Sequence, residues 1–115
     1  MASLNILMAQ MNTLVGDFDG NTQRVLDIVA GAATVHENAV VVFPELTLSG
    51  YPPEDLLLRP SIELRVSQSL DRLCTELPAT AWVVVGYPRK EGDALYNVAG
   101  VIHGNELVVE YCKQS

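Results

Sequence analysis

Basic residues are scarce in this sequence of 115 residues. Lys and Arg number 7 and Asp and Glu number 14, so the net charge is −7. A nucleic-acid-binding surface needs clustered Lys and Arg. Because the sequence contains no such cluster, we expect no nucleic-acid partner. An acidic balance is compatible with a protein that handles small molecules, although it does not identify one.

The sequence also has few cysteines and no long apolar run. Its 2 cysteines, Cys74 and Cys112, form neither a disulfide framework nor a metal-binding spacing, and the two histidines stand alone. No apolar run approaches the roughly 18 residues of a membrane-spanning helix. Residues 1–12 have neither the basic nor the apolar region of a signal peptide. We therefore expect a cytoplasmic protein with reduced thiols, no metal site and no membrane association.

Several catalytic motifs are absent as well. There is neither a G-x-x-x-x-G-K-[ST] phosphate loop nor a G-x-G-x-x-G dinucleotide motif. Ser49 lies in TLSGY rather than in a G-x-S-x-G nucleophile elbow. These absences argue against a phosphate-loop nucleotidase, a dinucleotide-binding domain and an α/β-type serine hydrolase.

Apolar segments of two kinds are present. Strands are expected at residues 4–11, 40–43, 81–87, 95–103 and 106–113, and helices at 22–38 and 61–76. The apolar residues at helical spacing are Val25, Ile28, Val29, Ala32 and Val35 in the first helix and Ile62, Val66, Leu70, Leu73 and Leu77 in the second. Asn21 or Thr22 is expected to cap the first helix. Residues 88–93 predict a turn, and Gly104-Asn105 predicts a hairpin between the last two strands.

The order β-α-β-α-β-β-β predicts a single α/β domain. Strand–helix–strand units favour parallel pairing with right-handed crossovers, and the closing hairpin adds antiparallel strands. The length is enough for one domain with a core, near the low end for an α/β enzyme. Because sheets in layered folds are covered on both sides, the second face of this sheet needs a partner layer and would otherwise be left bare.

One carboxylate, Glu45, stands at the carboxyl end of a predicted strand. In VVVFPELTLSGYPP, residues 40–53, Pro44 ends ladder pairing because it lacks an N–H. Glu45 follows it, where α/β sheets usually carry their sites. It could act as a general base, or it could cap a helix or pair with a basic residue, the commoner role of an isolated Glu. Lys113, at the end of the last strand, could stabilise an oxyanion or be a solvated terminal lysine.

Cys112 is a candidate nucleophile whose thiolate Lys113 would favour. Adjacent residues in a strand point to opposite faces, however, so these two side chains should not serve one site unless a bulge lies between them. We therefore interpret Cys112 as structural. Cys74 stands beside the apolar stripe of the second helix, and we interpret it as a small core residue.

The segment FPELTLSGYPPEDLLLRP, residues 43–60, strongly resembles the nitrilase, or carbon–nitrogen hydrolase, superfamily. Further segments of that family pattern stand in the expected order: LNILMAQMN, GDFDGN, VVVGYPR, ALYNVAGVIHGN and YCK. FPEL and GYP are shared across the superfamily, whereas PPEDLLL is most similar to the N-terminal glutaminase domain of glutamine-dependent NAD+ synthetases. The resemblance covers essentially all 115 residues.

The resemblance implies an αββα sandwich, of which residues 1–115 would be the incomplete N-terminal part. It also implies a Glu–Lys–Cys triad in which Glu45 is the general base and Lys113 stabilises the oxyanion. The cysteine would form a glutamyl thioester and release ammonia, with glutamine as the substrate. Tyr51 either lines the glutamine pocket or packs within its loop, and both roles stay open.

The family's nucleophilic cysteine lies downstream of the lysine, and neither Cys74 nor Cys112 matches its position. We therefore expect an N-terminal fragment that is inactive alone, needs no cofactor itself and lacks the C-terminal synthetase domain. That domain would use ATP and Mg²⁺ to amidate nicotinic acid adenine dinucleotide to NAD+, and the intact protein is expected to form a homo-oligomer. The alternatives are another nitrilase-branch amidase, acting on a different C–N bond, and a non-catalytic α/β interaction module.

Overall fold

The computed structural model describes residues 5–50, 61–92 and 94–113. Tyr51 lies outside these ranges, so its predicted role in a substrate pocket stays a prediction. The elements are β1 (Asn5–Met8), α1 (Phe18–Val35), β2 (Ala39–Val42), α3 (Ser61–Glu76), β3 (Trp82–Glu91), β4 (Ala94–His103) and β5 (Glu106–Lys113). Their order confirms the predicted β-α-β-α-β-β-β pattern.

The strands form a five-stranded sheet in the order β1-β2-β3-β4-β5. The first three run parallel to one another, and β3, β4 and β5 are antiparallel neighbours. The helix α1 joins β1 to β2, and α3 joins β2 to β3. Two right-handed crossovers that step in the same direction across a sheet place both helices on the same face.

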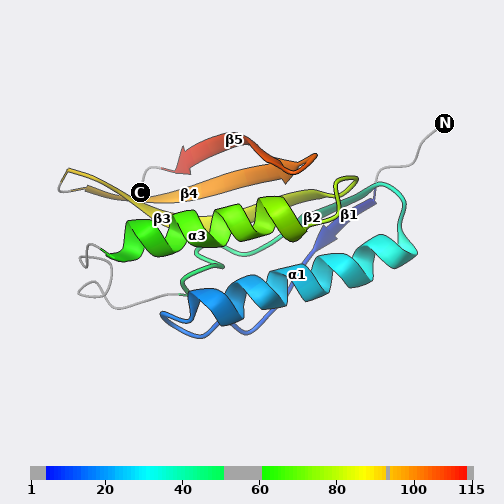
Figure 1. Cartoon of the computed structure of the whole chain (residues 1–115), viewed down its shortest axis with the longest axis horizontal. Coiled ribbons are helices and arrows are strands. Elements are labelled where there is room, and N and C mark those ends of the chain that lie inside the picture. Colours follow the sequence, from blue (N-terminus) through cyan, green and yellow to red (C-terminus); the bar gives the residue numbers. More distant parts are fainter. Residues whose placement is uncertain (1–4, 51–60, 93, 114–115) are drawn as a thin grey trace.

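Figure 1 shows α1 and α3 side by side on one face of the sheet, which we call the covered face. The core lies between this face and the two helices. Its fully buried apolar side chains include Val25, Val29, Val41, Leu73, Val83 and Val85. The apolar stripe predicted for the second helix is confirmed, because the five residues of that stripe are all buried. Burying one such side chain contributes about 1.5–3 kcal/mol, so this layer holds most of the apolar stabilisation.

The opposite face, which we call the open face, is apolar but has no covering element among the described residues. Ile6 and Met8 on β1 are 61% and 72% exposed, and Tyr111 on β5 is 70% exposed. In β1 these exposed side chains alternate with the half-buried Asn5 and Leu7. This is the pattern of a strand packed on one side only. The open face is therefore the face for which the sequence predicts a partner layer.

The start of α1 differs from the prediction. The helix begins at Phe18 rather than after a cap at Asn21 or Thr22. The reason is that the Asp17 carboxylate caps the first turn and accepts a hydrogen bond from the Gly20 N–H at 3.0 Å. A polar segment predicted as a loop is therefore the first helical turn.

Two further predictions are wrong. Val35, where α1 ends, is 74% exposed and takes no part in the buried stripe of that helix. Within the turn predicted at residues 88–93, residues 88–91 instead form the end of β3, which continues through Pro88 to Glu91, and residue 93 lies outside the described residues. The pairing of β2 with β3 ends at Val84. Beyond that point β4 is the only strand beside β3 in the described sheet, so a proline can turn its ring nitrogen to the unpaired side.

Candidate active site

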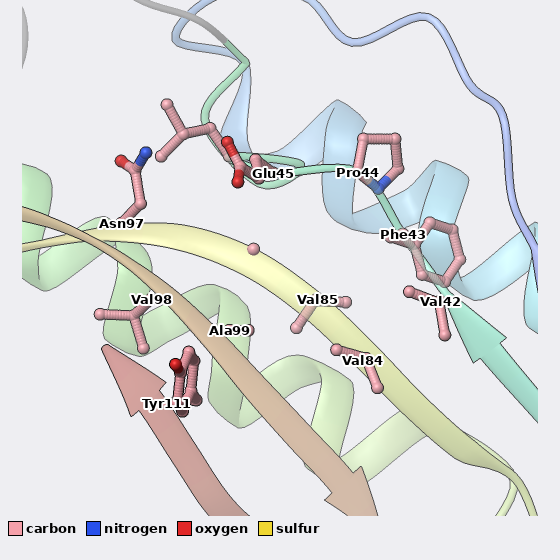
Figure 2. A pocket seen from close by; sticks show the side chains of 12 residues that line it. Val42, Phe43, Pro44, Glu45, Val84, Val85, Asn97, Val98, Ala99 and Tyr111 are labelled. Carbon is pink, nitrogen blue, oxygen red and sulfur yellow. The ribbon is translucent and has the colours of Figure 1, made fainter. Parts of the chain in front are cut away.

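Glu45 follows β2 on a short turn, residues 44–50, which we call the Glu45 turn. The chain passes from Phe43 through Pro44 to Glu45 and runs beside β3, close to Gly86 (Figure 2). Residues 46–50 are buried, whereas Pro44 and Glu45 are exposed. The turn therefore presents its single carboxylate from a packed support.

Hydrogen bonds hold this turn in place. The Thr47 hydroxyl donates to the Pro44 carbonyl within the turn. The Leu48 N–H donates to the Gly86 carbonyl of β3 at 3.1 Å, and the Asn21 side chain of α1 donates to the Leu48 carbonyl at 3.0 Å. Because the turn is bonded to both a helix and a strand, the sheet and the helix set the position of its carboxylate.

Gly86 is needed where the turn packs against β3. A Cβ at this position would lie 2.6 Å from the Leu46 nitrogen and 2.9 Å from the Pro44 carbonyl oxygen. Leu46 itself has φ = 53°, a left-handed conformation that is uncommon for residues other than glycine. Such strain costs about 1–3 kcal/mol and persists only where the surroundings impose it, often at functional sites. The turn thus packs backbone against backbone, and only glycine at position 86 leaves room for it.

Glu45 lines a pocket of about 160 Å³ that is built from β2, the Glu45 turn, β3, β4 and β5. We call it the Glu45 pocket. Most of its wall is aliphatic, and its polar side chains are those of Glu45, Asn97 and Tyr111 (Figure 2). The volume can hold several water molecules or one small polar group. An apolar pocket with a few convergent polar groups is the usual form of a small-molecule site.

The last strand brings residue 113 to the same end of the sheet. The backbone of Lys113 pairs with Asn97, and Tyr111 pairs with Ala99. Asn97, Ala99 and Tyr111 all line the pocket. Because residues two apart in a strand share a face, position 113 falls on the open face with Tyr111. The role of the Lys113 ammonium as an oxyanion stabiliser stays a prediction.

Neither cysteine is among the residues that line the pocket. Cys74 lies on α3 and packs against the core. Burial, together with the charges of Asp71 and Glu106, raises the pKa of its thiol. Cys112 is exposed on β5, one position beyond Tyr111, and strand alternation places it on the other face of the sheet.

The sequence interpretation missed a polar cluster on the covered face, formed by Tyr87 and Arg89 of β3 and Glu110 of β5. We call it the Glu110 cluster. The Tyr87 hydroxyl donates to Glu110 Oε2 at 2.5 Å, and Arg89 donates to Oε1 and Oε2 at 2.9 and 2.5 Å. Burial, followed by the hydrogen bond to Glu110, raises the pKa of Tyr87 far above its ordinary value. A carboxylate within an apolar strand was the available signal, but its partners are distant in sequence.

Metal-binding and membrane-spanning features are not seen in the part of the chain that the structure describes. Residues 5–50, 61–92 and 94–113 contain no group of three or more His, Cys, Asp or Glu side chains that could hold a metal ion. Within the same ranges, no helix has the length and apolar character to cross a membrane.

Comparisons with known proteins identify relatives of this sequence. Residues 6–114 match the family described as Carbon-nitrogen hydrolase. The glutamine-dependent NAD(+) synthetase of Xanthomonas campestris pv. campestris (strain 8004) is 39% identical over 112 residues, which are 97% of this chain and 20% of that protein. The chain thus spans about a fifth of the length of the curated relatives it matches.

Solved structures share the fold. A glutamine-dependent NAD+ synthetase from Acinetobacter baumannii, in complex with ADP, has a TM-score of 0.84 and 29% identity over 96% of this chain and 20% of that one. A mutant amidase of the nitrilase superfamily from Nesterenkonia has a TM-score of 0.82 and 23% identity over 97% of this chain and 43% of that one. At the latter identity the likeness concerns the fold alone. The predicted nitrilase-type α/β fold is confirmed.

Proposed function

This chain belongs to the carbon–nitrogen hydrolase family, and we propose that residues 1–115 are the N-terminal part of the glutaminase domain of a glutamine-dependent NAD+ synthetase. The observation that carries the proposal is the Glu45 turn, which holds one carboxylate at an otherwise mainly aliphatic pocket. The 39% identity to a protein of that name supports this branch of the family.

In the proposed reaction, Glu45 is the general base. Its carboxylate takes the proton of a cysteine thiol, and the thiolate attacks the carboxamide carbon of glutamine. The Lys113 ammonium stabilises the oxyanion of the tetrahedral intermediate. The intermediate collapses to a glutamyl thioester, and ammonia leaves with the proton that Glu45 returns. Water, deprotonated by Glu45, then hydrolyses the thioester to glutamate and restores the thiol.

The surroundings of Glu45 support a role in catalysis. A general base must lie within about 2.6–3.2 Å of the atom whose proton it takes, so its position has to be fixed. The hydrogen bonds of the Glu45 turn to β3 and α1 meet this requirement. Asn97 and Tyr111 add an amide and a hydroxyl to the same pocket, where a polar ligand can use them. The aliphatic wall strengthens electrostatic interactions by lowering the local dielectric constant.

The nucleophilic thiol is proposed to come from outside residues 1–115. Cys74 packs against the core on α3, and Cys112 is not among the residues around Glu45. Neither thiol is therefore in a position to receive help from Glu45. It follows from the proposal that the chain is inactive alone.

The later steps are proposed for the remainder of a longer protein. There, ATP and Mg²⁺ would serve to amidate nicotinic acid adenine dinucleotide with the ammonia, in NAD biosynthesis. A cytoplasmic location and a homo-oligomeric assembly belong to the same proposal.

A second candidate is a nitrilase-type amidase that acts on a different C–N bond. The Nesterenkonia amidase matches the fold nearly as well as the synthetase, with TM-scores of 0.82 and 0.84. The mainly aliphatic wall of the pocket is compatible with either amide substrate. Relative rates with glutamine and with short aliphatic amides distinguish the two candidates.

Ammonia release tests the proposal. The chain is assayed alone and joined to the part of the Xanthomonas campestris synthetase that follows the matched region. We expect no release from glutamine by the chain alone and turnover by the joined protein. Turnover by the chain alone that survives Cys112→Ala but not Glu45→Ala would refute the inactivity of the chain. A joined protein that hydrolyses only aliphatic amides would favour the second candidate.

A further inference from the structure

The Glu110 cluster links two strands that are not neighbours in the sheet. The strand β4 lies between β3 and β5, and the cluster passes over it at Gly100. A Cβ on Gly100 would lie 2.5 Å from the Tyr87 hydroxyl oxygen and 2.8 Å from a ring carbon. The tyrosine therefore crosses β4 where glycine leaves room, and its hydroxyl reaches Glu110 on the far strand.

Two features of β5 bear on its register. It lies at the edge of the sheet, with β4 as its only strand neighbour in the described part of the chain. Its ladder with β4 also shifts register between Val101 and Ile102. The two-residue hairpin turn at Gly104-Asn105 sets the register of β5 near the turn, but the bulge lies between this turn and Glu110 and locally disrupts the ladder, so a second contact can fix the register beyond it.

A slip of one residue would exchange the two faces of β5. In the observed register Glu110 meets Tyr87 and Arg89 on the covered face, while its neighbour Tyr111 lines the Glu45 pocket. In the slipped register Tyr111 would leave the pocket, and the Glu110 carboxylate would lose its partners. A partly buried carboxylate without partners costs free energy, so the cluster disfavours the slip.

We infer that the Glu110 cluster is a positioning device that fixes the register of β5, and so keeps Tyr111 at the pocket that contains Glu45 and the backbone of Lys113 beside Asn97. The effect of the cluster on the register of β5 does not depend on the proposed function. The catalytic consequence for Lys113 rests on the proposed function. Tyr87 and Arg89 act through β5, because their hydrogen bonds are to Glu110 and they are not among the residues that line the Glu45 pocket.

Amide hydrogen exchange of β5 tests the inference. The variants are Glu110→Gln and Tyr87→Phe, and the matched control is Asp27→Asn, which alters the exposed Gln23–Asp27 contact (2.9 Å) on α1, the helix that joins β1 to β2. We expect exchange in residues 106–113 to become about threefold to fivefold faster in the two cluster variants. Exchange in β2 and β3 should stay unchanged, and the control should match the unmodified chain.

Two results would overturn the inference. One is exchange in β5 at the unmodified rate in both cluster variants. The other is equal acceleration in every strand, which would make the cluster a general stabilising contact. If Glu110→Gln prevents folding, Tyr87→Phe decides alone, because it removes only the hydroxyl group and keeps the buried ring.

The titration of Lys113, followed by NMR, gives a readout that a merely stabilising contact would not change. If the proposed function places the Lys113 amine beside Glu45, Glu45→Gln in the otherwise unmodified chain removes a negative charge near that amine and should lower its pKa. In Glu110→Gln the same substitution should have little effect. An undiminished response there would overturn the inference. No response in the unmodified chain would instead refute the Glu45–Lys113 pairing of the proposed function, and the exchange experiment would still decide the register.

Discussion

The two faces of the sheet differ in what covers them and in what they carry. The covered face packs against α1 and α3, and Leu73, Val83 and Val85 are fully buried there. The open face carries the Glu45 pocket and leaves Met8 and Tyr111 72% and 70% exposed. Stability thus depends mainly on one face and the proposed chemistry on the other. Substitutions on the two faces should therefore change different properties of the protein.

Two leucines of α3 should show the largest contrast. Leu73 is fully buried against the covered face, whereas Leu64 on the same helix is 61% exposed. Leu73→Ala removes apolar burial and leaves a cavity, so we expect it to lower the free energy of unfolding by about 2–5 kcal/mol. Leu64→Ala should change it by less than about 0.5 kcal/mol. Urea unfolding measures both, and equal losses would contradict the location of the core.

Two glycine-to-alanine substitutions should change the free energy of unfolding in opposite directions. Gly86→Ala places a Cβ 2.6 Å from the Leu46 nitrogen, so we expect it to displace the Glu45 turn and to destabilise the fold by about 1–3 kcal/mol. Gly31 lies within α1, and an added Cβ would meet nothing within 4 Å. Gly31→Ala should therefore stabilise the protein by about 0.5–1 kcal/mol. Thermal unfolding shows whether each variant gains or loses stability. An unchanged stability of Gly86→Ala would argue against the close packing of the turn against β3.

The open face should control self-association of the chain. Met8 on this face and Leu64 on α3 are both exposed apolar residues, at 72% and 61%. Because contiguous exposed apolar surface promotes association, we expect Met8→Lys to weaken self-association about tenfold. Leu64→Lys, outside that surface, should weaken it less. Sedimentation velocity over a range of concentrations measures the effect. A stable monomer at every concentration would favour the non-catalytic interaction module instead.

Acid should weaken the Glu110 cluster, and the resulting loss of stability should be the smallest of the effects predicted for this protein. Burial alone would raise the pKa of Glu110, but hydrogen bonds from Tyr87 and Arg89 outweigh it and lower the pKa from 4.5. With a lowered pKa in the folded state, the cluster contributes fully above pH 4.5 and loses its contribution as the pH falls through the folded value. Because the carboxylate is partly exposed, we expect less than about 1 kcal/mol.

Urea unfolding at neutral and at acidic pH measures this loss as the difference between the two free energies of unfolding. Glu110→Gln should remove it, and Glu76→Gln, which breaks the exposed ion pair of α3, should retain it. An acid-induced loss of the same size in Glu110→Gln would show that other carboxylates cause it.

The sequence predicted α3 well because its signals are local. The bounds 61–76 and the buried stripe follow from regular helical spacing that ends before Pro78. The start of α1 and the course of β3 through Pro88 were not predictable in the same way. The first depends on a cap by Asp17, and the second on which edge of β3 is unpaired. Both follow from contacts that spacing alone does not specify.

For the site, the sequence predicted the carboxylate but not its surroundings. Glu45 was a candidate because it follows Pro44 at the end of an apolar strand, whereas the family resemblance favoured its role as a general base, which stays a prediction. The pocket requires Gly86 beneath the turn and Asn97 and Tyr111 from strands far along the chain. These residues are brought together by the strand order and register of the sheet, which depend on tertiary structure. The same reason explains why the partners of Glu110 were missed.

Glutamine turnover by the joined protein tests the role of Glu45 most directly. Glu45→Gln keeps the size of the side chain and removes the base, and Glu37→Gln, at an exposed position between α1 and β2, is the matched control. We expect Glu45→Gln to lower kcat by about a hundredfold to ten-thousandfold and Glu37→Gln to leave it unchanged. Equal turnover by the two variants would contradict the assignment of the open face as the catalytic face.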